Sequence, residues 1–149
     1  MKPKDRPLNE EEGAEMKQGI AAGLQRVNLS TSSPPDLVQQ AIKPVIDQLR
    51  TQFANQSEDD GGDAIWALAS LWGDAVTRAT DWEWILLLDG DEEIHAIAPP
   101  ARSHVIYPFH YIHSLLSDPD ADQTSLLLYN MLKAGNLPPA KPGDYYAIG

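Results

Sequence analysis

The sequence predicts an α+β protein, with N-terminal helices, a central helix packed on a three-stranded antiparallel meander, and two C-terminal helices. Three observations predict this class. Apolar residues recur at helical spacing through the first half of the chain, three short apolar runs with short links follow, and helical spacing returns after Pro108. The 149 residues suit one compact domain, in which residues 1–57 form a helical segment and residues 58–149 form the α+β core.

Two helices are expected before this core. Asn9 is a favourable N-cap and Glu12 stands at the capping-box position, so the first helix should follow Asn9. The apolar residues of this helix form a thin stripe: Met16, Ile20, Leu24 and Val27. A stripe so narrow is typical of a peripheral helix that packs lightly or waits for a partner. The second helix should begin near Pro34 and kink or break at Pro44, and a polar loop over residues 56–62 should follow it.

The central helix, residues 63–79, has the clearest pattern. Its apolar arc covers more than half of the circumference and contains Ile65, Trp66, Leu68, Ala69, Leu71, Trp72, Ala75, Val76 and Ala79. The opposite side carries Asp63, Ser70, Asp74, Thr77 and Arg78. An arc this wide predicts a core helix. We expect Trp72 to pack with Trp82 and Trp84 where this helix meets the first strand.

The meander is expected over residues 82–88, 93–98 and 104–107. The first run is apolar at nearly every position, which indicates a strand buried on both faces. Asp89 and Gly90 form a strong hairpin signal between the first two runs. Three consecutive strands with short links predict an antiparallel arrangement.

The C-terminal part should be helical again. One helix is expected from Pro108 and a second from about Asp122 to Lys133, where Gly135 is a natural C-cap. The tail, residues 143–149, is apolar for a terminus, so we expect it to dock on the body of the protein.

Charge and composition exclude several classes of function. The chain has 22 acidic and 11 basic residues, a net charge of −11, and a surface this acidic is repelled by nucleic acid. Cysteine is absent, which excludes disulfides, thiolate catalysis and cysteine-based zinc sites. No apolar run approaches the length of a membrane helix, and the N-terminus leads into acids rather than into an apolar signal core. We therefore expect a cytoplasmic protein with neither a nucleic-acid nor a membrane partner.

The acidic residues are concentrated in one segment. Residues 58–93 contain eleven acids and a single base, Arg78. Because acids steer association and aromatic residues anchor interfaces, this segment predicts a surface for a basic protein partner. The candidate partner-binding residues are Asp59, Asp60, Asp63, Trp66, Asp89, Asp91, Glu92 and Glu93.

Catalytic and cofactor motifs are weak by comparison. The chain has no nucleophile elbow and no phosphate-binding or dinucleotide-binding glycine pattern, so we assign no catalytic residue and no cofactor. His110 and His113 share one face of a helix, and His104 and His95 precede them on strands. A small metal-dependent enzyme that uses these histidines is the alternative, although no zinc-protease pattern accompanies them.

Three stretches of the sequence resemble small bacterial domains of unknown function. They are ALASLWGDA at 67–75, WEW at 82–84 and VIYPF at 105–109. In such domains a helix leads into a Trp-bearing strand, a meander and a Pro-Phe step into closing helices, and some of these domains are encoded beside toxin or secretion genes. The resemblance implies an immunity or adaptor role and identifies no functional residue. With the small size and the acidic segment, it favours a non-enzymatic, immunity-type inhibitor of a toxin, with a secretion chaperone that binds through its first helix as a further alternative.

Overall fold

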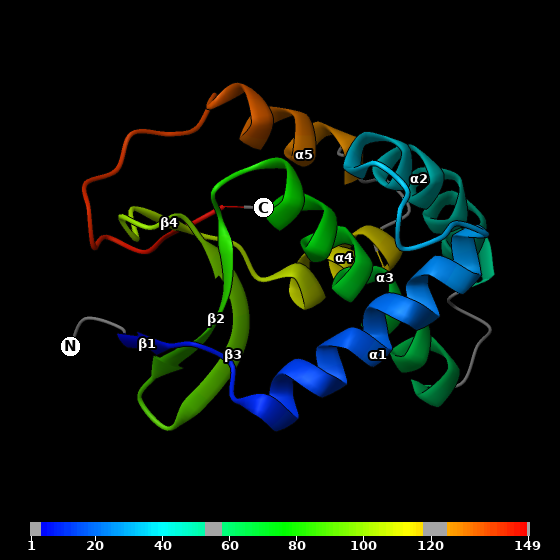
Figure 1. Cartoon of the computed structure of the whole chain (residues 1–149), viewed down its shortest axis with the longest axis horizontal. Helices are drawn as coiled ribbons and strands as arrows, with labels where there is room; N and C mark the ends of the chain where they lie inside the picture. The colour runs from blue at the N-terminus through cyan, green and yellow to red at the C-terminus, as the bar shows by residue number, and fades with distance from the viewer. Residues whose placement is uncertain (1–3, 53–57, 118–124, 149) are drawn as a thin grey trace.

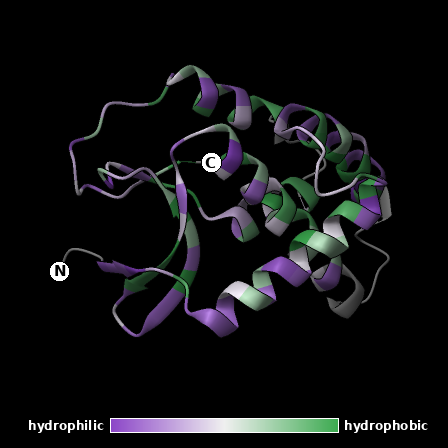
Figure 2. Cartoon of the chain, viewed as in Figure 1, coloured by the Kyte–Doolittle hydropathy of each residue, from purple (hydrophilic) through white to green (hydrophobic). Residues whose placement is uncertain are grey.

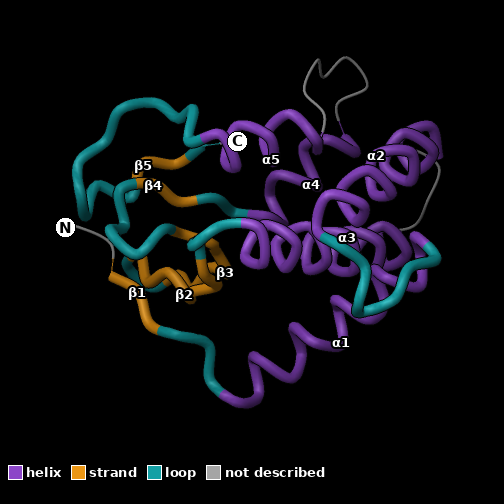
Figure 3. The backbone as a smooth tube through the Cα atoms, turned by 45° about the horizontal axis from the view of Figure 1, so that its top comes forward, coloured by secondary structure: helices purple, strands orange, loops and turns teal. Residues whose placement is uncertain are grey.

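A computed structural model describes residues 4–52, 58–117 and 125–148, with the backbone alone at 51–52, 58–61 and 125. The strands gather on one side of the molecule and the helices on the other (Figures 1 and 3). This arrangement confirms the α+β class. Within the described residues, no helix combines the length and the apolar character needed to cross a membrane.

The described chain begins with a short strand, continues through three helices and three strands, and ends with two helices and a last short strand. The elements are β1 (Lys4–Arg6), α1 (Glu10–Val27), α2 (Pro35–Gln52), α3 (Glu58–Ala79), β2 (Glu83–Asp89), β3 (Glu92–Ala98), β4 (His104–Val105), α4 (Pro108–Ser117), α5 (Ser125–Ala134) and β5 (Tyr146–Ala147).

The main sheet has three antiparallel strands, as expected, but they do not form a meander. Its order is β1-β2-β3, so the third strand comes from the N-terminus, with Asp5 opposite Leu87. The expected third strand, residues 104–107, joins β3 only through a bridge between Ile97 and Ile106. The short, charged sequence of β1 has no apolar alternation, which is why the sequence pattern does not reveal it.

The C-terminal tail docks on the body, as predicted. Its strand β5 pairs in parallel with β4, and the amides of Tyr146 and Ile148 donate to the carbonyls of Ser103 and Val105. These bonds occupy the backbone of the segment that was expected to extend the meander. Before the tail, Gly135 ends α5 with a positive φ of 70°, which confirms the predicted C-cap.

The sheet separates two apolar clusters. Trp84 and Ile97 face the helices and join the large cluster built from α2, α3, α4 and α5. Ile85, Leu87 and Ala96 point to the other face, where they pack with Val105 of β4, Tyr107 and Tyr145 of the tail. Both faces of β2 are therefore buried, which confirms the expectation from its uninterrupted apolar run.

Helix α1 packs closely on α3, so the expectation of a lightly packed peripheral helix is wrong. Gly19 and Gly23 are buried against α3, and a Cβ at Gly23 would lie 2.5 Å from the Ala67 carbonyl oxygen and 2.7 Å from Leu71 Cβ. This close approach also buries Ser70, which the helical pattern placed on the polar side. The spacing of large apolar residues did not predict this packing, because the contact is made at two glycines, Gly19 and Gly23, which such a pattern does not count.

Helix α3 packs mainly among helices rather than on the sheet, which corrects a second expectation. It meets β2 where Gly73 lies directly against the ring of Trp84. Trp72 and Trp82 belong to one core cluster and Trp84 packs against it, as expected, and the rings of Trp72 and Trp84 also contact α4. Trp72 packs on Tyr111 with ring centroids 5.1 Å apart, and Trp84 packs on Phe109 at 6.2 Å.

The helical half differs from expectation at Pro44 and at the start of α3. Helix α2 continues through Pro44 without a break, because it can lose one backbone hydrogen bond while its apolar face stays buried against α3. The loop expected over 56–62 is helical from Glu58 onward, as the first turns of α3. The remainder of that loop lies outside the described residues.

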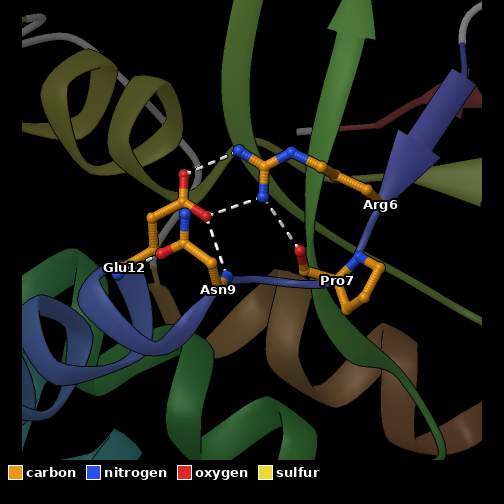
Figure 4. A network of polar contacts seen from close by, with 4 residues as sticks. All are labelled: Arg6, Pro7, Asn9 and Glu12. Atoms are coloured by element: carbon orange, nitrogen blue, oxygen red, sulfur yellow. Dashed lines mark hydrogen bonds and ion pairs between the residues drawn. The ribbon is translucent and has the colours of Figure 1, made fainter.

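The start of α1 is held by the predicted capping box. The Asn9 side chain accepts a hydrogen bond from the Glu12 amide at 2.8 Å, and the Glu12 carboxylate accepts one from the Asn9 amide at 2.9 Å. Arg6, the last residue of β1, donates to both oxygens of the same carboxylate at 2.7 and 3.1 Å (Figure 4). Glu12 therefore couples the first helix to the edge of the sheet.

We expect the contribution of Glu12 to be lost in acid. The hydrogen bonds from Arg6 and from the Asn9 amide lower its pKa from 4.5 to about 2. A carboxyl group with a lowered pKa stabilises the fold above its unfolded pKa, and this stabilisation disappears as the pH falls toward the folded value. Thermal unfolding should show Glu12→Gln less stable than the wild type near neutral pH, with the gap closing between about pH 4.5 and pH 2. A gap that stays constant over this range would contradict the assignment.

Candidate functional site

The outer end of the β2–β3 hairpin carries four exposed carboxylates. Asp89 and Glu92 face each other as the last register pair, and the two-residue turn between them contains Gly90 with a φ of 62°. Asp91 lies in the turn and Glu93 follows on β3, and all four acidic side chains are exposed. Figure 2 shows hydrophilic residues gathered at this end of the hairpin. The structure therefore brings four of the eight predicted binding residues together.

These four acids differ from many others in the described part of the chain because none of them forms a close ion pair, although Arg6 interacts with Glu93 over a longer distance. The acids that form ion pairs with the protein's own bases are Asp5, Glu12, Asp36, Asp47, Asp74 and Glu83. No ion pair within the described residues involves Asp89, Asp91, Glu92 or Glu93. Like charges directly opposite each other on a strand pair destabilise it, so the Asp89–Glu92 pair costs stability in the unbound protein. A cation that binds there would remove this cost.

The other predicted acids lie elsewhere. Asp63 is exposed in the second turn of α3, whereas the side chains of Asp59 and Asp60 lie outside the described residues. Figures 1 and 3 place the start of α3 and the turn of the hairpin on opposite sides of the molecule. The predicted binding acids therefore lie in two separate groups rather than on the single surface that the sequence suggested, because the length of α3 and β2 separates them.

Trp66, which was expected to be partly exposed beside Asp59, Asp60 and Asp63, is partly buried and belongs to an aromatic cluster. Its ring stacks on Phe109 with centroids 4.8 Å apart, and His95 meets it edge-on at 6.0 Å. Phe109 also contacts Trp84, so one ring of α4 joins α3, β2 and β3. The side chain is partly buried there, which follows from its position on the flank of the α3 apolar arc.

The structure does not bring the four histidines together. His104 is buried, and its ring nitrogens lie 2.8 Å from Ser103 Oγ and 2.6 Å from the Pro138 carbonyl oxygen. His95 belongs to the Phe109 cluster, while His110 and His113 are exposed on α4. The part of the chain that the structure describes holds no group of three or more side chains placed to bind a metal ion. The three-ligand arrangement required by the enzyme alternative is therefore not formed by these residues.

Sequence reasoning missed an open hollow beside α4. It has a volume of about 390 Å³ and is lined by Ile65, Phe109, His110, His113 and Ser114. Phe109 both lines this hollow and contacts His95 of β3 with ring centroids 5.7 Å apart. The helical spacing of Phe109 and the two histidines was the available signal, but the sequence does not show that Ile65 of α3 lies opposite them.

A polar network behind the sheet was also missed. Arg102 pairs with Asp5 of β1 at 3.0 Å and with Glu83 of β2 at 2.7 Å, and the Tyr145 hydroxyl donates to Asp5 at 2.5 Å. Burial alone would raise the Asp5 pKa, but the hydrogen bonds from Arg102 and Tyr145 outweigh it and hold this pKa below its usual value. The network joins both ends of the chain, and its members are too far apart in sequence for a pattern to connect them.

Comparisons of the chain with protein-family models, with curated proteins and with solved structures give no match. A functional interpretation therefore depends on the residues and the geometry described above.

Proposed function

We propose that this protein is a non-enzymatic binding protein of the immunity type, which neutralises a basic toxin or effector in the cytoplasm. The observation that carries the proposal is the group of four exposed hairpin carboxylates, Asp89, Asp91, Glu92 and Glu93, none of which forms an ion pair with a described residue. The protein carries a net charge of −11, so its field also attracts a cationic partner over a distance.

The hairpin is suited to enter a basic cleft. Its two strands pair over seven residues each, and a third strand supports β2 from the other side. The acidic end is therefore held by a rigid sheet, so little conformational entropy is lost when a partner binds. Binding would also relieve the repulsion between Asp89 and Glu92. In this mechanism the hairpin occupies the cleft and blocks access of the toxin's substrate.

Neutralising the hairpin tests the proposal. The variant carries Asp89→Asn, Asp91→Asn, Glu92→Gln and Glu93→Gln. The wild type should capture a basic protein from its native lysate at low salt and release it at high salt, and the variant should not capture it. With the purified partner, we expect the association rate constant of the variant to be about tenfold lower or more at low salt, because steering by charge is lost.

A control variant separates the hairpin from net charge. It neutralises the same number of exposed acids outside the hairpin and outside the first turn of α1, at Glu15, Asp47, Asp81 and Asp144. This control should keep most of the association rate. The captured protein, when expressed alone, should arrest growth, and co-expression of the wild type should restore it. Equal binding by the wild type and the hairpin variant, or binding that does not respond to salt, would contradict the proposal.

A further inference from the structure

The strand β3 is an edge strand of the main sheet over most of its length. The order β1-β2-β3 leaves one side of β3 without a strand of this sheet. Only Ile97, near its end, makes a bridge on that side, to Ile106. The chain then turns away at Pro108 into α4, so no described strand lies beside Glu93 and His95.

The hydrogen bonds of Ile97 show which backbone groups point outward. Its amide and its carbonyl both bond to Ile106 at 2.9 Å, away from β2. Because the backbone of a strand alternates in direction with every residue, the amides and carbonyls of Glu93 and His95 point to the same outer side. Within the described part of the chain, these outward groups make no hydrogen bond. They form a two-residue template for another strand.

We propose that the partner adds an extended, basic segment to this free edge of β3, so that its backbone pairs with Glu93 and His95 and its cationic side chains meet the hairpin carboxylates. This inference rests on the proposed function and names the binding mode. Adding a strand to a sheet edge is a common mode of recognition, in which backbone bonds supply affinity and side chains supply specificity.

The negative charge beside the free edge of β3 favours a basic partner strand over a second copy of this chain. A second copy of this chain on the same edge would bring two acidic hairpins together, and such like-charge contacts are unfavourable. A strand with lysine or arginine at alternate positions places opposite charges there instead.

The test uses two short peptides of equal charge. One alternates lysine with valine and can form a strand, and the other alternates lysine with proline, which lacks the amide that pairing needs. We expect the Lys–Val peptide to bind at least about tenfold more tightly than the Lys–Pro peptide. It should also protect the amides of Glu93 and His95 from hydrogen exchange. Equal affinity, or no protection of these amides, would overturn strand addition.

A pair of variants isolates the backbone contribution. Glu93→Ala and Glu93→Pro both remove the carboxylate, but only the proline removes the outward amide, which the fold itself does not use. Affinity for the Lys–Val peptide should fall about tenfold further in Glu93→Pro than in Glu93→Ala. Circular dichroism and melting temperature control for folding, and hydrogen exchange of the wild type gives an answer that requires no variant. Equal affinity of the two variants would overturn the inference.

The outcomes distinguish this inference from the proposed function. Suppose that both peptides bind with equal affinity, that this binding depends on salt, and that it is abolished in the hairpin-neutralised variant. This result would overturn strand addition and still support the acidic hairpin as a binding surface. Loss of salt dependence, or binding unchanged by neutralisation of the hairpin, would contradict the proposed function itself.

Discussion

Replacing Gly23 by alanine is expected to lower the free energy of unfolding by about 2 kcal/mol. The new Cβ would lie 2.5 Å from the Ala67 carbonyl oxygen and 2.7 Å from Leu71 Cβ, so α1 must move away from α3. Overpacking of this kind costs about 3 kcal/mol at its upper end, and the better helix propensity of alanine returns about 1 kcal/mol. Denaturant unfolding followed by circular dichroism measures the difference.

Gly13 provides the matched control in the same helix. A Cβ there has no atom within 4 Å, so Gly13→Ala should raise the free energy of unfolding by about 0.5–1 kcal/mol through propensity alone. Opposite signs for the two variants would establish that Gly23 is required for close packing and not for its backbone freedom. Stabilisation by both substitutions would show that α1 does not rest on α3 as closely as described.

The second large effect is expected at Arg102. Its guanidinium pairs with Asp5 and Glu83 and donates to the Pro99 carbonyl at 3.0 Å, and it is only 20 % exposed. Arg102→Met keeps much of the packing but leaves Asp5, itself 14 % exposed, without its cation. Removing one partner of a pair this buried costs about 2–3 kcal/mol, toward the lower end for a partly solvated group. Arg102→Lys keeps the charge but cannot donate to both carboxylates in the same geometry, so its free energy of unfolding should lie between those of the wild type and Arg102→Met.

Acid provides an independent check on this network. The Asp5 carboxyl has a lowered pKa, so its stabilising effect is present above the unfolded value of 3.8 and is lost as the pH falls below it. The destabilisation caused by Arg102→Met should therefore shrink at low pH. In a double-mutant cycle with Asp5→Asn, the two effects should be less than additive. Additive effects would show that the two residues act separately.

Much of the local structure could be predicted from the sequence. Asn9 and Glu12 form the capping box, Gly90 takes a left-handed conformation in the hairpin turn, and Gly135 ends the last helix. Each prediction succeeded because the signal and the structure that it specifies lie within a few residues. The exposed group at residues 89–93 could be predicted for the same reason, since a hairpin turn exposes the acids that form it.

The candidate site could be predicted only in part. The sequence placed the acids near the start of α3 on one surface with the hairpin, although α3 begins on the other side of the molecule. The open edge of β3 could not be predicted, because the sequence indicated that residues 104–107 would pair with this strand. Such pairings depend on competition between segments, and a local pattern contains no information about a distant competitor.

The sequence by itself determined the class of the protein, the positions of its caps and turns, the buried strand β2 and the acidic end of the hairpin. These features depend on periodicity, backbone preference and charge within short windows. Only the tertiary structure decided that β1 completes the sheet, that β5 takes the backbone of β4, and that Gly19 and Gly23 bring α1 onto α3. The physical reason is that strand partners and close helix contacts are chosen by the free energy of the whole chain, in which residues far apart in sequence compete for the same hydrogen bonds and the same buried space.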